Sequence, residues 1–379
     1  MKVEQKIWDK KSGWKNLNGS DLSKKANLVI AFGPENLIKE TEKYEELKSM
    51  YPTADIVMSS SISGIIGNDI MDSSIVLSAL HFEKTKIQTI EVDIREVKDS
   101  FDAGAHLSAN LDKDDLSGLV VLSDSLPLVN GSHLLTGIYF NLSEHVPVTG
   151  GLSSNYNNSS ALIGLNKPPE TGKIIGIGFS GQHFKIGHGI DAGWTSFGTE
   201  RFITKAKDNV VYKLDHLTPY EFYTQYLEGI VESVDAASMH FPLGLRLEGT
   251  KSRLIRSALS INKKDGSMTF SGDVPEGGSV RMMKTNVSNL IDSAAAAARR
   301  SLTNFKIKNP DFSLVINCVG RSEILNEWSQ EENDAIINNI GKDTSVMGTY
   351  SHGEFSPLDK NKKSELQNQS IIITSFKEI

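Results

Sequence analysis

Residues 313–354 read SLVINCVGRSEILNEWSQEENDAIINNIGKDTSVMGTYSHGE, and this stretch sets the architecture expected for the rest of the chain. An apolar run at Leu314–Val319 is followed by a helical pattern around Glu327–Ile340 and by a second short run at Ser345–Gly348. Short apolar strands on either side of a helix are typical of parallel strands joined by a crossover. The stretch therefore predicts one strand–helix–strand unit.

The same pattern occurs twice earlier in the chain. Apolar runs at residues 27–32 and 54–58 flank a helix expected over residues 34–50. A second pair of runs, at residues 119–122 and 146–149, flanks a helix expected over residues 133–142. Three such units predict a mixed α/β (α+β) fold, built as two packed α/β halves with mixed parallel and antiparallel sheets.

Antiparallel hairpins are expected between these units. Residues 74–82 and 87–92 are separated by a short polar link and are predicted to pair. Two further hairpins are predicted around Lys264-Asp265-Gly266 and around Asp208-Asn209, since Asp-Gly and similar pairs favour tight turns.

The chain is long enough for two domains. At 379 residues it exceeds the size at which a single hydrophobic core usually stops growing. A helix beginning near residue 218 carries a capping box, Thr218 with Glu221, and Pro219 at its first position. We predict an N-terminal domain over residues 26–216 and a C-terminal domain over residues 217–376.

Small residues follow the second strand of every unit: Ser59-Ser60-Ser61, Gly150-Gly151 and Tyr350-Ser351-His352 lie at these positions. Ligands of open α/β sheets gather beyond the carboxyl ends of the strands, and free backbone N–H groups there can bind an anion. The alternative is that small residues only avoid clashes in tight turns. The pattern leaves both interpretations open.

Composition points to the cytoplasm and away from membranes and nucleic acids. No apolar run of about 18 residues is present, and the charged N-terminus lacks the apolar region of a secretory signal. The single cysteine, Cys318, lies in an apolar run and predicts an inert buried thiol in a reducing compartment. The net charge is −7 and the lysines are scattered, which argues against nucleic-acid binding.

Catalytic motifs are missing. The sequence has no phosphate-binding loop of the Gly-x-x-x-x-Gly-Lys-Ser/Thr type and no His-Glu-x-x-His or Cys-x-x-Cys pair. Gly178-Phe179-Ser180-Gly181-Gln182 fails the nucleophile elbow because its last glycine is replaced. These failures favour a binding protein over an enzyme.

An ordered set of short blocks resembles the FIST sensory domain, with its N-terminal and C-terminal halves. The blocks are VPVTGGLS (146–153), GW (193–194), NVVYKLD (209–215), PLG (242–244), VPEG (274–277), GR (320–321), GTYSHGEFSP (348–357) and LQNQ (366–369). The resemblance implies a non-enzymatic bacterial sensor that binds small ligands such as amino acids. Some members of this length hold haem on a histidine, sense nitric oxide and regulate a histidine kinase or a cyclic-di-GMP enzyme (diguanylate cyclase or phosphodiesterase).

His188 is the residue expected to hold such a haem b. Strand alternation places Phe184, Ile186 and His188 on one apolar face and His183 on the other, with Trp194 close by in sequence. Haem requires an axial imidazole and apolar walls, which this face would supply. A hydrogen-bonded structural imidazole is the alternative for His188.

An amino-acid-like ligand would use a different set of residues. Arg321 follows the first strand of the third unit, where its guanidinium could clamp a carboxylate, although an internal salt bridge explains it equally well. The other expected contacts come from the strand ends: Gly150, Gly151, Tyr350, His352 and Glu354. A hydrolase or lyase using His352 and Glu354 is the rival class of function. The sequence contains no effector domain, so output through a separate protein is expected, while dimerisation stays open.

Overall fold

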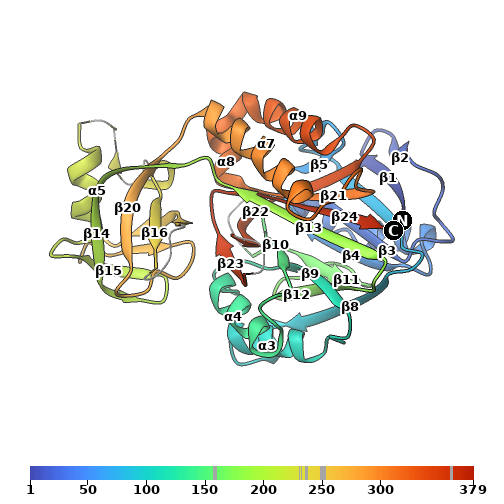
Figure 1. The fold of residues 1–379 in the computed structure, drawn as a ribbon, viewed down its shortest axis with the longest axis horizontal. Helices are drawn as coiled ribbons and strands as arrows, with labels where there is room; N and C mark the ends of the chain where they lie inside the picture. Colours follow the sequence, from blue (N-terminus) through green and yellow to red (C-terminus); the bar gives the residue numbers. More distant parts are fainter. Residues whose placement is uncertain (157–159, 230, 232, 235–237, 248–252, 359–361) are drawn as a thin grey trace.

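The computed structural model describes residues 1–156, 160–229, 231, 233–234, 238–247, 253–358 and 362–379. Figure 1 shows a large body that contains both termini, and a small lobe joined to it by two extended connections. The body holds a six-stranded and an eleven-stranded sheet, and the lobe holds a seven-stranded sheet. The mixture of helices with parallel and antiparallel strands confirms the predicted mixed α/β class.

Three parallel strand pairs confirm the three predicted units. They are β3 (Leu28–Gly33) with β4 (Asp55–Ser60), β9 (Leu116–Ser123) with β10 (Val148–Ser153), and β21 (Phe312–Cys318) with β22 (Ser345–Pro357). The helices that join these pairs are α1 (Glu35–Ile38) and α2 (Thr41–Met50), α4 (Gly131–Asn141), and α8 (Val319–Leu325) and α9 (Ser329–Ile340). The helix expected over residues 34–50 is broken at Glu40, whose extended backbone separates α1 from α2.

Each parallel pair belongs to a larger repeated unit of four strands. The spatial orders are β4-β3-β7-β1, β10-β9-β12-β8 and β22-β21-β24-β13. In each unit the last two strands of the order pair antiparallel. The additional strands are β1 (Lys2–Asp9), β7 (Ile75–His81), β8 (Lys86–Asp93), β12 (Lys173–Ser180), β13 (Phe184–Asp191) and β24 (Ile371–Glu378). One topology is therefore used three times.

Apolar side chains alternate along the strands and fill the layers between the sheets and helices. Val120 and Leu122 point into the core between the two sheets of the body, whereas Leu119 and Val121 pack against α4 and α3 (Ser100–Ala109). On the same face, α7 (Val287–Thr303) and α9 cover the third unit. The opposite sheet carries α1 and α2 on its outer face. Four layers result: helix, sheet, sheet and helix.

The second and third units are joined edge to edge through β10 and β22. These strands run antiparallel, with Gly150 opposite Phe355 and Gly151 opposite Glu354. Gly150 has a φ of +121°, and a Cβ there would lie 2.0 Å from the carbonyl oxygen of Val121. A glycine is required at this position because any side chain would push β9 away from β10.

The small lobe interrupts the third unit between β13 and α7. It is one continuous segment whose sheet has the order β17-β16-β20-β14-β15-β19-β18. Its elements are β14 (Thr195–Lys207), β15 (Val210–Leu214), α5 (Pro219–Leu227), β16 (Leu243–Arg246), β17 (Leu254–Arg256), β18 (Ala258–Ile261), β19 (Met268–Phe270) and β20 (Ser279–Lys284). The domain boundary predicted between residues 216 and 217 falls inside this lobe, so sequence halves and structural bodies divide the chain differently.

The remaining strands extend the body. β2 (Gly13–Asn18) and β11 (Ile163–Leu165) lie at the edges of the six-stranded sheet. β23 (Ser364–Gln367) pairs with β22, and β5 (Gly64–Ile66) pairs with β22 and with β6 (Asp69–Met71). Because β5 follows β4 along the chain, its pairing with β22 ties the first unit to the third. Within the described residues, no helix has the length and apolar character to cross a membrane.

Two of the predicted hairpins are confirmed. Strands β14 and β15 pair across Asp208, which adopts the positive φ of 51° that such a turn needs, and β18 pairs with β19 across the turn at residues 264–266. The capping box of Thr218 and Glu221 at the start of α5 is also formed.

The hairpin predicted between residues 74–82 and 87–92 is wrong. Strand β7 pairs with β1 and β3, whereas β8 pairs with β12 in the other sheet. The carboxylate of Glu378 holds the link between them: it accepts hydrogen bonds from the backbone N–H groups of Glu83, Lys84 and Thr85, at 2.8–2.9 Å. This contact spans almost the whole chain, so a local pattern could not predict it.

The helix α7 lies on β13 through two glycines, which gives a testable constraint. A Cβ at Gly189 would lie 2.0 Å from the carbonyl oxygen of Ala297 in α7. We expect Gly189→Ala to lower the free energy of unfolding by about 3 kcal/mol through overpacking. The exposed Lys185 on the same strand is the control, and Lys185→Ala should change it by less than about 0.5 kcal/mol. Urea denaturation measures both, and equal losses would contradict close packing at Gly189.

Candidate functional site

The carboxyl ends of the three parallel pairs meet inside the body. The hydroxyls of Ser59 and Ser153 lie 2.7 Å apart, and the Ser154 hydroxyl donates to the carbonyl oxygen of Tyr350 at 2.7 Å. Ser61 accepts a hydrogen bond from the backbone N–H of Tyr350 at 3.1 Å. The three segments of small residues thus lie together, and their polar groups bond to one another. The expectation that they follow the second strands is wrong for most of these residues, because β4, β10 and β22 extend through them.

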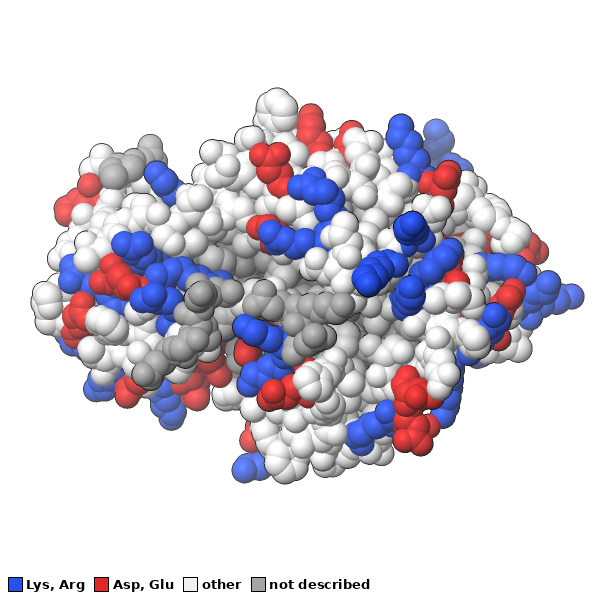
Figure 2. All heavy atoms as spheres, in the orientation of Figure 1, with Lys and Arg blue, Asp and Glu red and all other residues white. Residues whose placement is uncertain are grey.

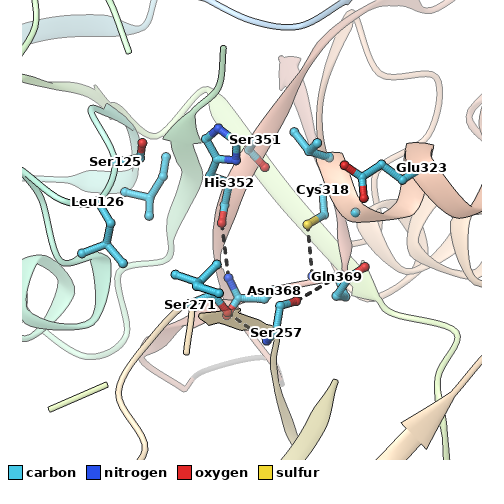
Figure 3. Close-up of a pocket in the computed structure, with 14 residues that line it drawn as sticks. Ser125, Leu126, Ser257, Ser271, Cys318, Glu323, Ser351, His352, Asn368 and Gln369 are labelled. Carbon is cyan, nitrogen blue, oxygen red and sulfur yellow. Dashed lines mark hydrogen bonds between the residues drawn. The ribbon is translucent and has the colours of Figure 1, made fainter. Parts of the chain in front are cut away.

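A cavity opens beside this junction, between the small lobe and the body. Its volume is about 320 Å³, within the range of small-molecule sites. Ser257, Leu259 and Ser271 line it from the lobe, while the body contributes residues at or after the ends of β9 and β21, within β10 and β22, and in the segment after β23. Figure 3 shows Cys318, His352, Asn368 and Gln369 among these body residues.

Glu354 lies beneath the cavity as a fully buried carboxyl. It accepts hydrogen bonds from the hydroxyl of Ser351 at 2.7 Å and from the hydroxyl and N–H of Ser370 at 2.8 and 3.2 Å. Burial outweighs these bonds and raises the pKa of Glu354 from 4.5 to about 7. The pKa of this buried group therefore lies near neutral pH.

Cys318 lines the cavity next to this carboxyl. Its sulfur accepts a hydrogen bond from the backbone N–H of Gln369 at 3.2 Å. Burial, and then the neighbouring Glu354, raise the pKa of the thiol well above its ordinary value. The thiol stays protonated and buried, as the sequence predicts, but it forms part of the cavity wall.

Two cavity-lining side chains each have a polar atom without a partner among the described residues. The amide nitrogen of Gln369 donates to the Ser257 hydroxyl at 3.0 Å, whereas its Oε1 oxygen accepts nothing. Nε2 of His352 is also unpaired. Burial lowers the pKa of His352 to about 4, so its imidazole is neutral at physiological pH.

Gln369 also fastens the body to the lobe. Its amide reaches Ser257 of the lobe, and its backbone carbonyl accepts a hydrogen bond from the indole N–H of Trp194 at 3.1 Å. Trp194 belongs to the connection between β13 and β14, so the residue expected as a haem wall lies instead where the chain enters the lobe. A Cβ on Gly320 would come within 2.3 Å of the Gln369 amide, and this glycine therefore makes room for the side chain.

Arg321 lies away from the cavity lining, in a saturated internal network. It forms a salt bridge with Glu332 and donates to the carbonyl oxygens of Ala192 and Leu290, both at 2.9 Å, and to the hydroxyl of Ser293. Its side chain is 0% exposed. The internal salt bridge, which was one of the two interpretations of this residue, is the one that the geometry shows.

The other expected ligand contacts divide between the wall and the interior. His352 lines the cavity and Glu354 lies directly beneath it. Tyr350 is buried in the core between the sheet and α7, and Gly150 and Gly151 lie in the central strand pairing. Of the six residues, His352 alone lines the cavity, and Glu354 is linked to it through the lining residue Ser351.

The four residues expected to hold haem do not line a common cavity. Phe184 and Ile186 belong to the core between the sheets, where the ring of Phe184 lies 5.5–5.9 Å from those of Phe82, Phe179 and Phe376. The void in that core measures about 10 Å³. His188 is buried against the ring of Phe305, at 4.6 Å between centroids, and His183 is exposed. The residues around His188 therefore do not fit a haem in this conformation.

Sequence reasoning missed most of the cavity wall. Ser125, Ser257, Asn368 and Gln369 were not predicted as contacts, and Cys318 was expected only as a core thiol. Ser125 follows the first strand of the second parallel pair, and Cys318 ends the first strand of the third. The sequence pattern identifies these strand ends. Ser257 belongs to the inserted lobe, whose position is not encoded in the repeat. Among the described residues no cluster of three or more histidine, cysteine or acidic side chains could hold a metal ion.

A two-lobed α/β protein with a cavity between its lobes is the class that this geometry defines. The FIST N domain matches residues 27–217 and the FIST C domain matches residues 219–357. The matches cover most of the chain, which therefore belongs to the FIST family of signal-transduction sensor domains. A comparison with curated proteins finds no match.

The raised pKa of Glu354 predicts a pH-dependent stability. The folded chain keeps this carboxyl protonated up to about pH 7, whereas the unfolded chain releases the proton near pH 4.5. The unfolded state binds fewer protons in this window, so the contribution of Glu354 to stability is complete below pH 4.5 and is lost as the pH rises to 7. The loss should amount to roughly 3 kcal/mol.

Urea unfolding of the wild type and of Glu354→Gln between pH 4.5 and 8 measures this effect. The low pKa of His352 acts in the opposite direction but is present in both proteins, so it cancels in the difference. We expect the stability of the wild type relative to Glu354→Gln to fall across the window. Parallel curves would show that Glu354 titrates normally.

Proposed function

We propose that this chain senses a small ligand that binds in the cavity between the lobe and the body. The observation that carries the proposal is the position of the cavity, since its wall comes from both bodies and includes unpaired polar atoms of Gln369 and His352. A ligand there contacts both bodies at once. It can therefore shift their relative position if it binds one arrangement more tightly than another.

The connections of the lobe suit such a response. The lobe is attached at residues 192–194 and 285–286, and the Thr285 hydroxyl donates to the carbonyl oxygen of Gly193 at 2.7 Å. Polar contacts across the interface supplement these connections: Nδ2 of Asn130 donates to Asp273 at 3.0 Å, and Nε2 of His133 lies 3.1 Å from the same carboxylate. Relative domain motion is the default expectation unless an interface within a chain is large and hydrophobic.

The partner that reads the lobe position is proposed to be a separate signalling protein, a histidine kinase or a cyclic-di-GMP enzyme. This part of the proposal rests on the resemblance to sensors of the family. Figure 2 shows acidic and basic side chains interspersed over one face of the molecule, without a continuous basic surface of the kind that binds nucleic acid.

A half-exposed residue at the cavity provides the test. Leu259 lines the cavity and is 48% exposed, whereas Leu17 is 46% exposed and lies in β2, far from the cavity in the fold. A low-molecular-mass cell extract that contains the ligand at about 100 times its Kd should raise the Tm by about 3 °C. Leu259→Trp should abolish the shift, because the indole fills the cavity mouth, and Leu17→Trp should keep it. A shift that survives Leu259→Trp would place the ligand elsewhere.

Haem remains a prediction from the resemblance that the surroundings of His188 do not support. An absorption spectrum of the protein incubated with haem decides the matter. From the packing of Phe184 and Phe305 we expect no Soret band that depends on His188. A band that is present in the wild type and in His183→Ala but absent in His188→Ala would establish haem ligation and require this packing to open.

A further inference from the structure

We infer that the cavity takes a small, partly apolar molecule that presents a hydrogen-bond donor and is uncharged or cationic, in preference to a carboxylate or phosphate. This inference rests on the proposed function, because it names the chemical class of the ligand for the same cavity. Three features of the wall carry it: its charges, its unpaired acceptor and its apolar surface.

No positively charged side chain of the described residues lines the cavity. The two buried arginines nearby donate hydrogen bonds to protein groups, and neither lines the cavity. Arg321 is paired with Glu332, and Arg256 donates to the carbonyl oxygens of Ile255, Asp273 and Leu366 at 2.9–3.0 Å. An anionic ligand would therefore lose its hydration without gaining a charged donor, which is strongly unfavourable in a buried site.

The acidic side chains at the cavity also disfavour an anionic ligand. Glu323 lines the cavity at its exposed end, and the carboxyl of Glu354 lies beneath it. The carboxylate of Glu323 disfavours a second negative charge and favours a cation or a neutral donor, while the buried carboxyl of Glu354 gives an anion no counter-charge.

Gln369 supplies the point of attachment. The side chain is 3% exposed, its nitrogen is held by Ser257, and its Oε1 oxygen is left without a donor. A buried acceptor in this state gains more from a hydrogen bond than an exposed one, because it has already lost its contact with water. An N–H or O–H group of the ligand satisfies it. A carboxylate cannot.

The rest of the wall is aliphatic. Leu126, Leu152, Leu259 and Val319 line the cavity and would surround a hydrocarbon portion of the ligand. A branched chain of leucine size that carries an amine or amide combines both properties, and the cavity volume of about 320 Å³ accommodates it.

Four probes with the same branched chain separate the charges. They are 3-methylbutylamine, leucinamide, leucine and 4-methylpentanoate, and their binding to the full chain is measured by calorimetry. We expect the amine and the amide to bind at least about tenfold more tightly than leucine and 4-methylpentanoate, since only the last two place a carboxylate in the cavity.

Variants of Gln369 test the attachment point. Gln369→Met removes the acceptor at similar volume and should weaken the amine about tenfold. Gln369→Glu keeps an acceptor and adds a negative charge, so it should bind the amine at least as tightly as the wild type. The control is Gln367→Met, because Gln367 is also buried at 3% exposure but does not line the cavity.

Three outcomes overturn the inference. Tighter binding of leucine or 4-methylpentanoate contradicts the charge argument, and equal binding by wild type and Gln369→Met contradicts the attachment point. Failure of all four probes also rejects this ligand class. The proposed function fails separately, when the Tm shift produced by the extract survives Leu259→Trp.

Discussion

The antiparallel pairing of β10 with β22 is the constraint on which the rest of the structure depends. It joins the second and third units into one sheet, and it works only because glycines allow the strands to approach. The FIST N and FIST C portions consequently share a core instead of forming two independent domains. The same pairing fixes where the strand ends meet, and thereby where the cavity forms.

Much of the fold could be predicted because its repeated unit has a local signature. Apolar runs on either side of a helix identified all three parallel pairs, and turn residues identified the hairpins of the lobe. The hairpin prediction that failed concerned a segment whose position depends on contacts distant in sequence. In sequence, the link between β7 and β8 resembles a hairpin turn. In the structure, Glu378, which lies nearly three hundred residues later, binds this link between the two sheets.

The site was less predictable than the fold for a related reason. The expected strand-end position drew attention to His352, which lines the cavity although β22 continues past it to Pro357. It could not distinguish Arg321, which forms a salt bridge with Glu332, from a residue that faces a ligand. The expected alternation put His183 and His188 on different faces, and the structure has His183 exposed just before β13 and His188 buried within it. It could not show that the apolar face beside His188 is already filled by phenylalanines of other strands. Whether a polar side chain is occupied or available depends on neighbours that sequence spacing does not specify.

The place of the lobe within the third unit has an evolutionary consequence. It is one uninterrupted segment that leaves and re-enters the body through adjacent connections, so its residues can change without altering the register of any strand in the two large sheets. Mutations in the lobe would alter one wall of the cavity, while the wall supplied by the repeats stays under the constraints of the shared core. Ligand preference can thus diverge among descendants of this architecture faster than the architecture itself.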